Sequence, residues 1–365
     1  MTEPIKCFLL DHGFTTQNNC SCCLIKFKGI NPTNSYKKYI ESDFYKSIKS
    51  KMDSGVWATE CEYCKKIESG GGLSMRLLHN KDFEFNKIDT LRHLTFNVGS
   101  ECNLQCRSCS PNLSSSWEKE VKENSSEKIF KKYYIDREGI NPNYDIDSED
   151  LTNIKNVHFL GGEPLYNSDT IKILEKIYNA TNGDCIISMN TNSTVKLNFN
   201  KYHFLKKFKG FALVLSIDAV DHQAEFIRTG CSWSKVNSVV DYYNSYDFVH
   251  LSNHTTHSVM NIFEYKKIVE WLKEKNIKDS EMTTFVEWPP FLSYKVLTED
   301  EKSRYKNLTN NDPELKYVYD RMNAEKHDSQ LREHFFKFME TTKRIHRMDW
   351  KEYLPDLYNL MHHFA

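Results

Sequence analysis

Short apolar runs alternate with helical patterns through the middle of the chain. The runs predict six strands, at residues 93–98, 157–160, 185–189, 211–217, 250–257 and 283–286. Stretches with apolar residues every three or four positions lie between them, for example 170–178 and 262–273. The run at 211–217 is almost wholly apolar, which is typical of a strand buried on both faces. Strands that alternate with helices predict a parallel sheet with crossover helices.

This pattern predicts an α/β fold with three parts. Residues 86–300 fit a partial (β/α)6 barrel of the TIM type, in which the chemistry lies at the carboxyl ends of the strands. Residues 1–85 are rich in cysteine and end near a run of three glycines, which predicts a small separate domain. Residues 301–365 are charged and without strand-like runs, so we expect a C-terminal helical segment.

Composition and charge exclude several classes of protein. The chain has 365 residues, 39% of them hydrophobic, so it is not intrinsically disordered. Its 49 basic and 50 acidic residues give a net charge of −1, which does not support binding to nucleic acid or to an anionic membrane. Its apolar stretches are too short to span a bilayer, and its start lacks a signal-peptide core. We therefore expect a cytoplasmic protein.

Cysteines carry the strongest chemical signal. The count is eleven, and an odd number without an export signal argues against a disulfide framework. Most of them fall into groups: Cys7; Cys20, Cys22 and Cys23; Cys61 and Cys64; and Cys102, Cys106 and Cys109. Grouped thiols in a reducing compartment usually bind metal. Cys185 lies within a strand pattern and is predicted to be core.

The last group lies directly after the first predicted strand. Cys102, Cys106 and Cys109 have the spacing Cys-x3-Cys-x2-Cys. Three thiolates on one short loop can hold three irons of a 4Fe–4S cluster and leave the fourth iron open to another ligand. A zinc site is the alternative, because a fourth thiol could come from elsewhere in the fold.

A glycine-rich motif ends the second predicted strand. It reads Gly161-Gly162-Glu163-Pro164. Glycines allow the backbone to approach a ligand closely, and a glutamate can accept hydrogen bonds from an ammonium group. Taken alone, the motif is also compatible with an ordinary turn.

Polar residues also follow the third and fourth predicted strands. Asn190 and Asn192 stand after the third, and Ser216 and Asp218 end the fourth. Arg228 follows, and its guanidinium presents a planar fork that suits a carboxylate. An ordinary polar turn for the asparagines and a surface ion pair for Arg228 are the alternatives.

The N-terminal cysteines predict a second metal site. Cys61 and Cys64 are spaced to bind one centre, and Cys7 with one cysteine of the 20–23 group would complete four thiolates. Of that group we select Cys22. Zinc and a closed iron–sulfur cluster both satisfy this spacing.

The residues of the three-cysteine loop resemble the motif of a known family. The stretch from Cys102 to Pro111 reads Cys-Asn-Leu-x-Cys-Arg-x-Cys-x-Pro, and Ser-Ser-Ser-Trp follows at 114–117. It resembles the radical S-adenosylmethionine (radical SAM) enzymes, in particular a subgroup with an N-terminal twitch domain, a SPASM-like module. Ser108 departs from the aromatic residue that many members have before the last cysteine.

The resemblance implies a role for each motif. It implies a 4Fe–4S cluster on Cys102, Cys106 and Cys109. It implies contact of the residues 161–164 with the amino group of S-adenosylmethionine. Asn190 and Asn192 would face its ribose and methionine parts, and Ser216 and Arg228, beside Asp218, its carboxylate.

The N-terminal region resembles the twitch domain. The order is one cysteine, a Cys-Cys pair, then Cys-x2-Cys-x3-Glu and Ser-x-Arg. This order implies a second, auxiliary 4Fe–4S cluster on Cys7, Cys22, Cys61 and Cys64. The chain lacks the Pro-Trp pair that the family has after the first cysteine.

The resemblance predicts a radical SAM enzyme. An external one-electron donor such as flavodoxin or ferredoxin would reduce the cluster, and a 5′-deoxyadenosyl radical would remove hydrogen from the substrate. The expected substrate is a peptide side chain. A nucleotide, a sugar or a nucleic-acid base is the alternative, and the basic and aromatic stretch 202–209 favours it. A non-enzymatic zinc scaffold is a third reading. The sequence assigns no catalytic side chain beyond these cofactor-binding residues.

Overall fold

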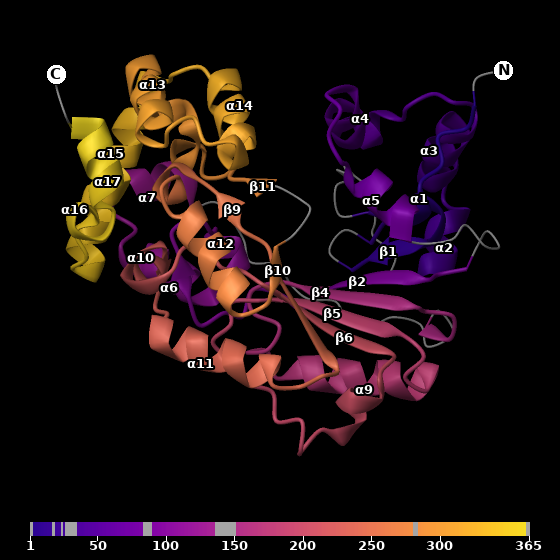
Figure 1. Ribbon diagram of the computed structural model, residues 1–365. Helices are drawn as coiled ribbons and strands as arrows, with labels where there is room; N and C mark the ends of the chain where they lie inside the picture. Colours follow the sequence, from indigo (N-terminus) through magenta and orange to yellow (C-terminus); the bar gives the residue numbers. More distant parts are fainter. Residues whose placement is uncertain are drawn as a thin grey trace.

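The computed structural model describes residues 3–16, 19–22, 25, 35–82, 90–135, 151–279 and 284–362. Its centre is a seven-stranded parallel sheet in the order β1-β2-β4-β5-β6-β8-β10 (Figure 1). The strands of this sheet are β1 (Gly13–Thr15), β2 (His93–Asn97), β4 (Asn156–Leu160), β5 (Ile186–Thr191), β6 (Gly210–Leu215), β8 (Val249–Asn253) and β10 (Lys278–Asp279). The α/β class is confirmed, and the sheet is consistent with a partial TIM barrel.

Two strands differ from the sequence-based expectation. The sixth predicted strand, 283–286, does not join the barrel sheet. Thr284–Phe285 (β11) pairs instead with Thr256–His257 (β9) in a separate two-stranded sheet, and residue 283 lies outside the described residues. The barrel edge is β10, which pairs with β8. It is two residues long, Lys278 and Asp279, so the sequence has no apolar run that would reveal it.

At the other edge, the strand β1 comes from the N-terminal region. It pairs with β2, Gly13 opposite His93 and Thr15 opposite Thr95. The main hydrophobic core is continuous across this pair, because Phe14 belongs to the same buried cluster as Leu94. Residues 3–82 therefore contribute to the barrel sheet.

Helices cover one face of the sheet and flank the other. The described helices are α1 (Phe8–His12), α2 (Tyr36–Glu41), α3 (Asp43–Asp53), α4 (Glu62–Ser69), α5 (Met75–Asp82), α6 (Ser115–Glu123), α7 (Lys128–Tyr133), α9 (Asp169–Thr181), α10 (Asp221–Ile227), α11 (Trp233–Asn244), α12 (Tyr265–Glu274), α13 (Glu299–Leu308), α14 (Lys316–Ala324), α15 (Ser329–His346), α16 (Trp350–Tyr353) and α17 (Pro355–His362). As expected, the part after 300 is helical. None of the described helices combines the length and apolar character needed to cross a membrane.

The two faces of the sheet differ in burial. Val157, Phe159, Ile187 and Leu213 point to the side of α9, α11 and α12 and are fully buried. Their neighbours in each strand, such as Ser188, point the other way and are half-exposed. In closed barrels this inner face is filled by branched apolar side chains. Here it carries half-exposed side chains of mixed character, among them His158, Ser188 and Val214.

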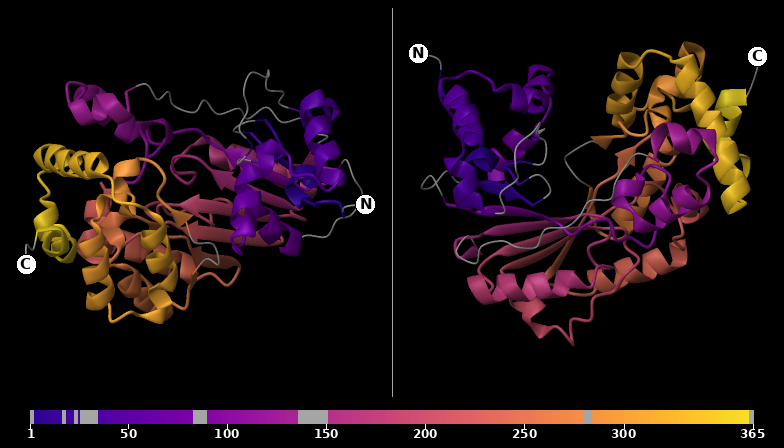
Figure 2. Two further views of the ribbon diagram at one scale, coloured as in Figure 1. Left: turned by 90° about the horizontal axis from the view of Figure 1, so that it is seen from above. Right: turned by 180° about the vertical axis from the view of Figure 1, so that it is seen from behind.

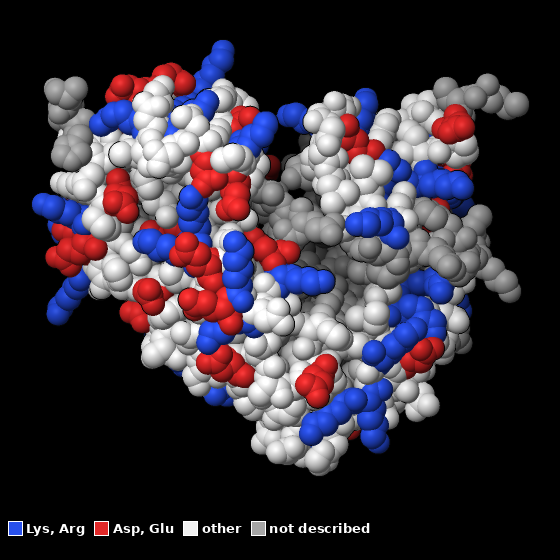
Figure 3. Space-filling model, viewed as in Figure 1, with Lys and Arg blue, Asp and Glu red and all other residues white. Residues whose placement is uncertain are grey.

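The open face lies between two masses of helices. The N-terminal helices α1–α5 stand above one end of the sheet and α13–α17 above the other (Figures 1 and 2). The space-filling view is hollowed between them (Figure 3). The hydroxyl of Tyr63 in α4 is close enough to Glu287 and Arg321 for their charges to act on it. The two masses thus face each other across this opening.

Candidate functional site

The three-cysteine loop follows β2 and is held by serines at the start of α6. Ser115 N donates to Ser100 O at 2.7 Å, and Ser116 Oγ donates to Cys102 O at 2.7 Å. Ser114 Oγ donates to Leu104 O at 2.6 Å and also accepts from Trp117 N, which caps the helix. The serine run at 114–116 therefore fixes the backbone of the loop.

The three thiols of this loop lie together and are shielded from water. Cys102 and Cys106 form one small buried cluster with Leu104, against which Cys109 packs. Burial raises the pKa of all three thiols, that of Cys109 to about 11. Buried neutral thiols next to one another become thiolates when a metal binds their sulfurs and their protons are released.

The three thiols of the loop form a donor set that a 4Fe–4S cluster can use. Within the described ranges, no group of three or more His, Cys, Asp or Glu side chains is arranged to hold one metal ion. The cysteines of a 4Fe–4S cluster bind different irons, so their sulfurs need not converge on one point. The donor set of three shielded thiols, with Arg228 acting on each of them, suits an anionic cluster.

The glycine motif packs directly on the cysteine loop. Gly162 N donates to Gly99 O and Glu163 N to Glu101 O, both at 2.8 Å. A Cβ on Gly162 would lie 2.8 Å from the Ser100 and Glu101 carbonyl carbons, and closer still to Glu101 O. Gly161 has a φ of +136°, which a residue with a Cβ rarely adopts. Two glycines are therefore required here for the two loops to touch.

Glu163 is a fully buried carboxylate at the centre of the site. Its oxygens accept from Leu165 N at 3.0 Å, from Thr191 Oγ1 at 2.9 Å and from Asn192 N. Burial raises its pKa to about 7, and these donors only partly oppose the effect. Pro164 continues the turn, and its carbonyl accepts from Thr170.

Asn192 joins the third strand end to the cysteine loop. Its Nδ2 donates to Asn103 Oδ1 at 2.9 Å and lies 3.8 Å from Cys102 Sγ. Asn103 Nδ2 in turn donates to Thr194 Oγ1 at 2.9 Å. Asn190 is in β5, opposite Val214, and is half-exposed on the inner face of the sheet.

The fourth strand end carries an ion pair. Arg228 Nη1 donates to Asp218 Oδ2 at 2.6 Å, and Asp218 Oδ1 accepts from Thr256 N at 2.9 Å. Burial opposes the charge on Arg228, but Cys106 and Asp218 outweigh it and raise its pKa. Ser216 is half-exposed on the inner face, and its N–H donates to Thr191 O. The structure thus brings all nine predicted cofactor-binding residues to one edge of the sheet, around the cysteine loop.

A second group of cysteines lines a cavity in the N-terminal part. Cys7, Cys22, Cys61 and Cys64 all border it, together with apolar side chains that include Trp57. Burial raises the pKa of Cys7 to about 12 and of Cys61 to about 11, and both Cys61 and Cys64 act on Cys7. Four thiols thus line one cavity, together with the polar side chains of Glu60, Tyr63 and Arg76.

The alternatives to Cys22 differ in placement. Cys20 is fully buried, does not border the cavity, and its Sγ donates to Cys22 O at 3.1 Å. Cys23 lies outside the described residues. No disulfide joins any two of the described cysteines.

The motif after Cys64 forms an ion pair beside this cavity. Arg76 Nε donates to Glu68 Oε1 at 2.9 Å and Nη2 donates to Oε2, while Ser74 Oγ donates to Oε1. The same guanidinium lies 5.4 Å from the Trp57 ring. This bidentate pair joins α4, which carries Cys64, to α5.

Four further cysteine and histidine residues have structural surroundings. Cys185 is fully buried in the core. His254 bonds Thr284 Oγ1 at 2.8 Å, and His257 packs among Tyr265, Phe285 and Tyr317. Cys231 packs against the small cysteine cluster, and its Sγ donates to Ala224 O at 3.5 Å.

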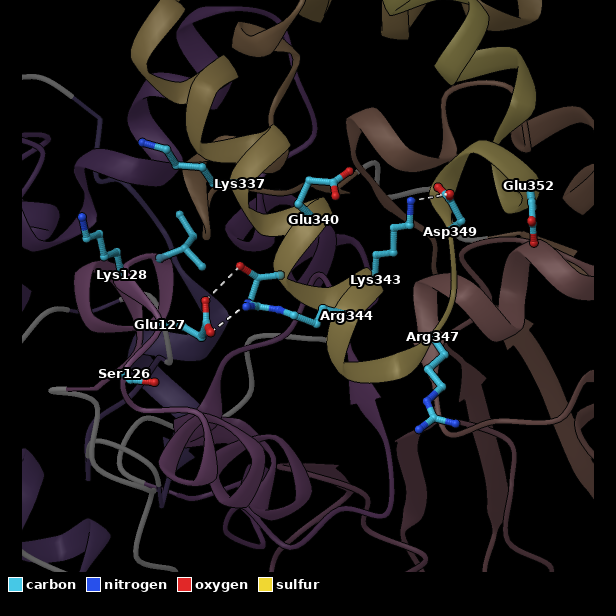
Figure 4. Close-up of a pocket in the computed structure, with 12 residues that line it drawn as sticks. Ser126, Glu127, Lys128, Lys337, Glu340, Lys343, Arg344, Arg347, Asp349 and Glu352 are labelled. Atoms are coloured by element: carbon cyan, nitrogen blue, oxygen red, sulfur yellow. Dashed lines mark hydrogen bonds and ion pairs between the residues drawn. The ribbon is translucent and has the colours of Figure 1, made fainter.

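A large hollow in the described part lies elsewhere. It is a groove between the start of α7 and the end of α15, and none of the predicted site residues borders it (Figure 4). Its charges largely compensate one another: Arg344 pairs with Glu127 at 2.8 Å and Lys343 with Asp349 at 2.7 Å.

Some site residues were not singled out from the sequence. Asn103, Thr191 and Thr194 complete the hydrogen bonds around Glu163 and Asn192. Asn103 lies inside the cysteine motif, and Thr191 stands between the two predicted asparagines. Their position next to motif residues was the available signal.

Comparison with known proteins gives a family and a distant set of structures. Residues 96–286 match the sequence model of the radical SAM superfamily. No curated protein matches. The solved structure of anSMEcpe with bound S-adenosylmethionine is 18% identical, with a TM-score of 0.41, 64% of this chain and 62% of that chain covered.

Streptococcus suis SuiB is a further distant neighbour. Bound to S-adenosylmethionine, it is 15% identical with a TM-score of 0.36, over 71% of this chain and 58% of that one. Bound to its precursor peptide SuiA, it is 14% identical with a TM-score of 0.34, over 71% and 60%. The chain thus spans about three fifths of the length of these solved proteins.

Proposed function

The chain belongs to the radical SAM superfamily, and from this premise we propose that Cys102, Cys106 and Cys109 hold its 4Fe–4S cluster. The observation that carries the proposal is that three shielded thiols lie together on one loop, on which the turn of Glu163 packs and whose Cys106 stands opposite Arg228. When bound, the cluster supplies the electron that splits S-adenosylmethionine into methionine and a 5′-deoxyadenosyl radical.

The residues of the chain bind and orient the sulfonium cofactor in this proposal. Glu163 accepts hydrogen bonds from its ammonium group and Arg228 donates to its carboxylate, with Ser216 beside it. Asn190 and Asn192 bond its ribose and methionine parts. The apolar side chains around the thiols exclude water, which strengthens these charged contacts.

Replacement of all three loop cysteines tests this assignment. The variant with Cys102, Cys106 and Cys109 changed to Ala should lose about half of its iron and no longer cleave S-adenosylmethionine. Cys185→Ala is the matched control, because Cys185 is buried far along the chain from the loop. If the triple variant, reduced with dithionite, still forms 5′-deoxyadenosine at the wild-type rate, the assignment is wrong.

We further propose that residues 1–85 form a twitch-type unit with an auxiliary 4Fe–4S cluster on Cys7, Cys22, Cys61 and Cys64. What supports this is the shared cavity that the four thiols line. Four thiolates would saturate the cluster, so it would not bind S-adenosylmethionine. Tyr63, between two of these cysteines, is close enough to Glu287 and Arg321 for their charges to act on it, so we expect this cluster to lie beside the opening.

Cysteine variants separate the auxiliary site from the reactive one. Cys61→Ala with Cys64→Ala should lower the iron content while S-adenosylmethionine cleavage remains. Cys22→Ala should do the same, whereas Cys20→Ala should keep all the iron. About four irons and one tightly held zinc per chain would contradict an iron–sulfur cluster at this site.

For the substrate we propose a peptide side chain, from the resemblance to auxiliary-cluster enzymes. Half-exposed polar residues on the inner face of the sheet, such as Ser188 and Asn190, can offer hydrogen bonds to such a chain. Modification of a nucleotide, sugar or nucleic-acid base is the second candidate, favoured by the lysines over tyrosines around 196–206. A flavodoxin- or ferredoxin-type protein would supply the electron. Anaerobic incubation with a precursor peptide encoded beside this gene, followed by mass spectrometry, tests the first candidate.

A further inference from the structure

Arg107 lies inside the three-cysteine loop and is fully buried. Its backbone N–H donates to Ile227 O and its Nε donates to Phe226 O, both at 2.9 Å. The guanidinium carbon lies 4.0 Å from the centre of the Phe226 ring. One residue therefore joins the cysteine loop to the carboxyl end of α10, next to Arg228.

The remaining nitrogens of Arg107 lack partners. Nη1 and Nη2 are buried, and nothing in the described part of the chain bonds them. The acid that acts on this charge is Glu120 of α6, whose Oε1 lies 3.1 Å from His346 Nε2. Burying a guanidinium without a bonded anion is unfavourable. A neutral side chain would fill this space at lower cost, so packing alone does not explain an arginine here.

The backbone connection between the loop and α10 is otherwise short. β3 (Gln105–Cys106) and β7 (Arg228–Thr229) form an antiparallel pair in which Cys106 stands opposite Arg228. This ladder has only two residue pairs, and Arg107 adds two hydrogen bonds directly at its end. The position of Cys106 relative to Arg228 thus depends on Arg107.

We propose that Arg107 is a positioning residue that fixes the separation of Cys106 and Arg228, so that the open iron and the carboxylate-binding guanidinium reach the same S-adenosylmethionine molecule. This inference rests on the roles proposed above for the two residues. The buried positive charge behind the loop also favours the anionic thiolates and the extra negative charge of the reduced cluster.

Two substitutions separate these contributions. Arg107→Met keeps an unbranched side chain but removes the charge and the Nε donor. Arg107→Lys keeps the positive charge. A lysine lacks the planar guanidinium, which can donate to the Phe226 carbonyl and lie over the Phe226 ring at the same time. Arg344→Met is the matched control, because Arg344 is an exposed arginine of α15 that pairs with Glu127.

The test uses full-length protein reconstituted anaerobically with iron and sulfide. Iron content and visible absorbance report the cluster, and electron paramagnetic resonance of the reduced protein with and without S-adenosylmethionine reports whether that ligand reaches it. Both Arg107 variants should keep their iron but bind S-adenosylmethionine about tenfold more weakly, as expected for one lost charged hydrogen bond. The ligand-induced spectral change should shrink in both. The midpoint potential should become more negative in Arg107→Met and stay near wild type in Arg107→Lys.

Wild-type affinity and a wild-type spectral change in Arg107→Met would overturn the inference. If Arg107→Met does not fold, Arg107→Lys decides, and unchanged binding of S-adenosylmethionine in that variant overturns it equally. A wild-type protein without iron–sulfur absorbance would instead contradict the proposed cluster itself, so the two failures are distinguishable.

Discussion

At the scale of single residues, Glu163 affects stability and function in opposite directions. Its burial disfavours the charged carboxylate, which is the form proposed to bind the ammonium group of S-adenosylmethionine. It is a fully buried carboxylate whose pKa burial raises to about 7. Between the unfolded pKa and this value the folded state holds the proton more tightly than the unfolded state. The contribution of this group to the stability of the ligand-free protein therefore falls as the pH rises from about 4.5 to 7. It stays low at higher pH.

Glu163→Gln should reverse this balance. A glutamine resembles the protonated acid, so at pH 5 the two proteins should unfold at similar temperatures. At pH 8 removal of the buried charge should stabilise the ligand-free variant by on the order of 3 kcal/mol. About 1–3 kcal/mol of this is offset, because the amide nitrogen cannot accept the hydrogen bond that Leu165 N or Asn192 N gives to the carboxylate. The affinity of the variant for S-adenosylmethionine at pH 8 should fall roughly ten- to hundredfold. Thermal unfolding at both pH values and ligand titration measure the two effects.

A variant that is less stable than wild type at pH 8 would contradict the buried charge. Unchanged affinity would separately dismiss the proposed contact with the ammonium group. In the wild-type protein, the same ionisation should make binding of S-adenosylmethionine weaken as the pH falls below about 7.

At the scale of elements, the site depends on the close packing of two loops. The turn after β4 touches the loop after β2 through the backbone of Gly162, with no space for a methyl group. Gly162→Ala must push the Ser100–Glu101 backbone at the start of the cysteine loop away from the turn, which costs about 1–3 kcal/mol. We expect a lower unfolding temperature together with a lower iron content, measured by calorimetry and metal analysis.

Gly70→Ala is the control for that substitution. Gly70 ends α4 with a φ of −88°, and a Cβ there would approach Ile67 O to 3.4 Å. The change should alter the stability by less than about 0.5 kcal/mol and leave the iron content intact. If both alanine variants behave alike, the contact of the two loops does not govern cluster binding.

At the scale of the whole molecule, the N-terminal unit adds the edge strand β1 to the central sheet. β1 pairs with β2, and Phe14 and Tyr36 share one buried core with Leu94. Removing residues 1–85 would expose the edge of β2 and the apolar surface beneath it, which favours aggregation. We expect a chain of residues 86–365 to be recovered as aggregates, whereas removal of residues 1–4 should leave a well-folded protein. Size-exclusion chromatography and circular dichroism distinguish them.

A monodisperse 86–365 chain that still cleaves S-adenosylmethionine would contradict this expectation. It would mean that the β1–β2 pair adds little to the stability of the barrel. The same result would also show that the auxiliary cysteines are dispensable for the first half of the reaction.

Local patterns were sufficient where the chemistry is contiguous in sequence. Cys102, Cys106 and Cys109 are neighbours on one loop, and the glycines at 161 and 162 directly precede Glu163. The helix-strand alternation likewise predicted β2, β4, β5 and β6 from their apolar residues, and β8 from its place in the alternation. The sequence alone therefore determined the α/β class and the superfamily.

Long-range pairing decided what these patterns could not contain. β1 and β10 are short and lack a distinctive apolar run, so their membership in the sheet depends on the edges that β2 and β8 leave open. The four thiols of the N-terminal cavity are far apart in sequence and meet only after α1, α4 and the 20–22 segment pack together. In the sequence, Arg107 is one charged residue within a motif, and nothing marks it as buried. In the folded protein it is shielded from water, and its hydrogen-bond partners are the carbonyls of Phe226 and Ile227. Spacing along the chain determines which donors are available, whereas desolvation and partner choice depend on surfaces that exist only in the folded molecule.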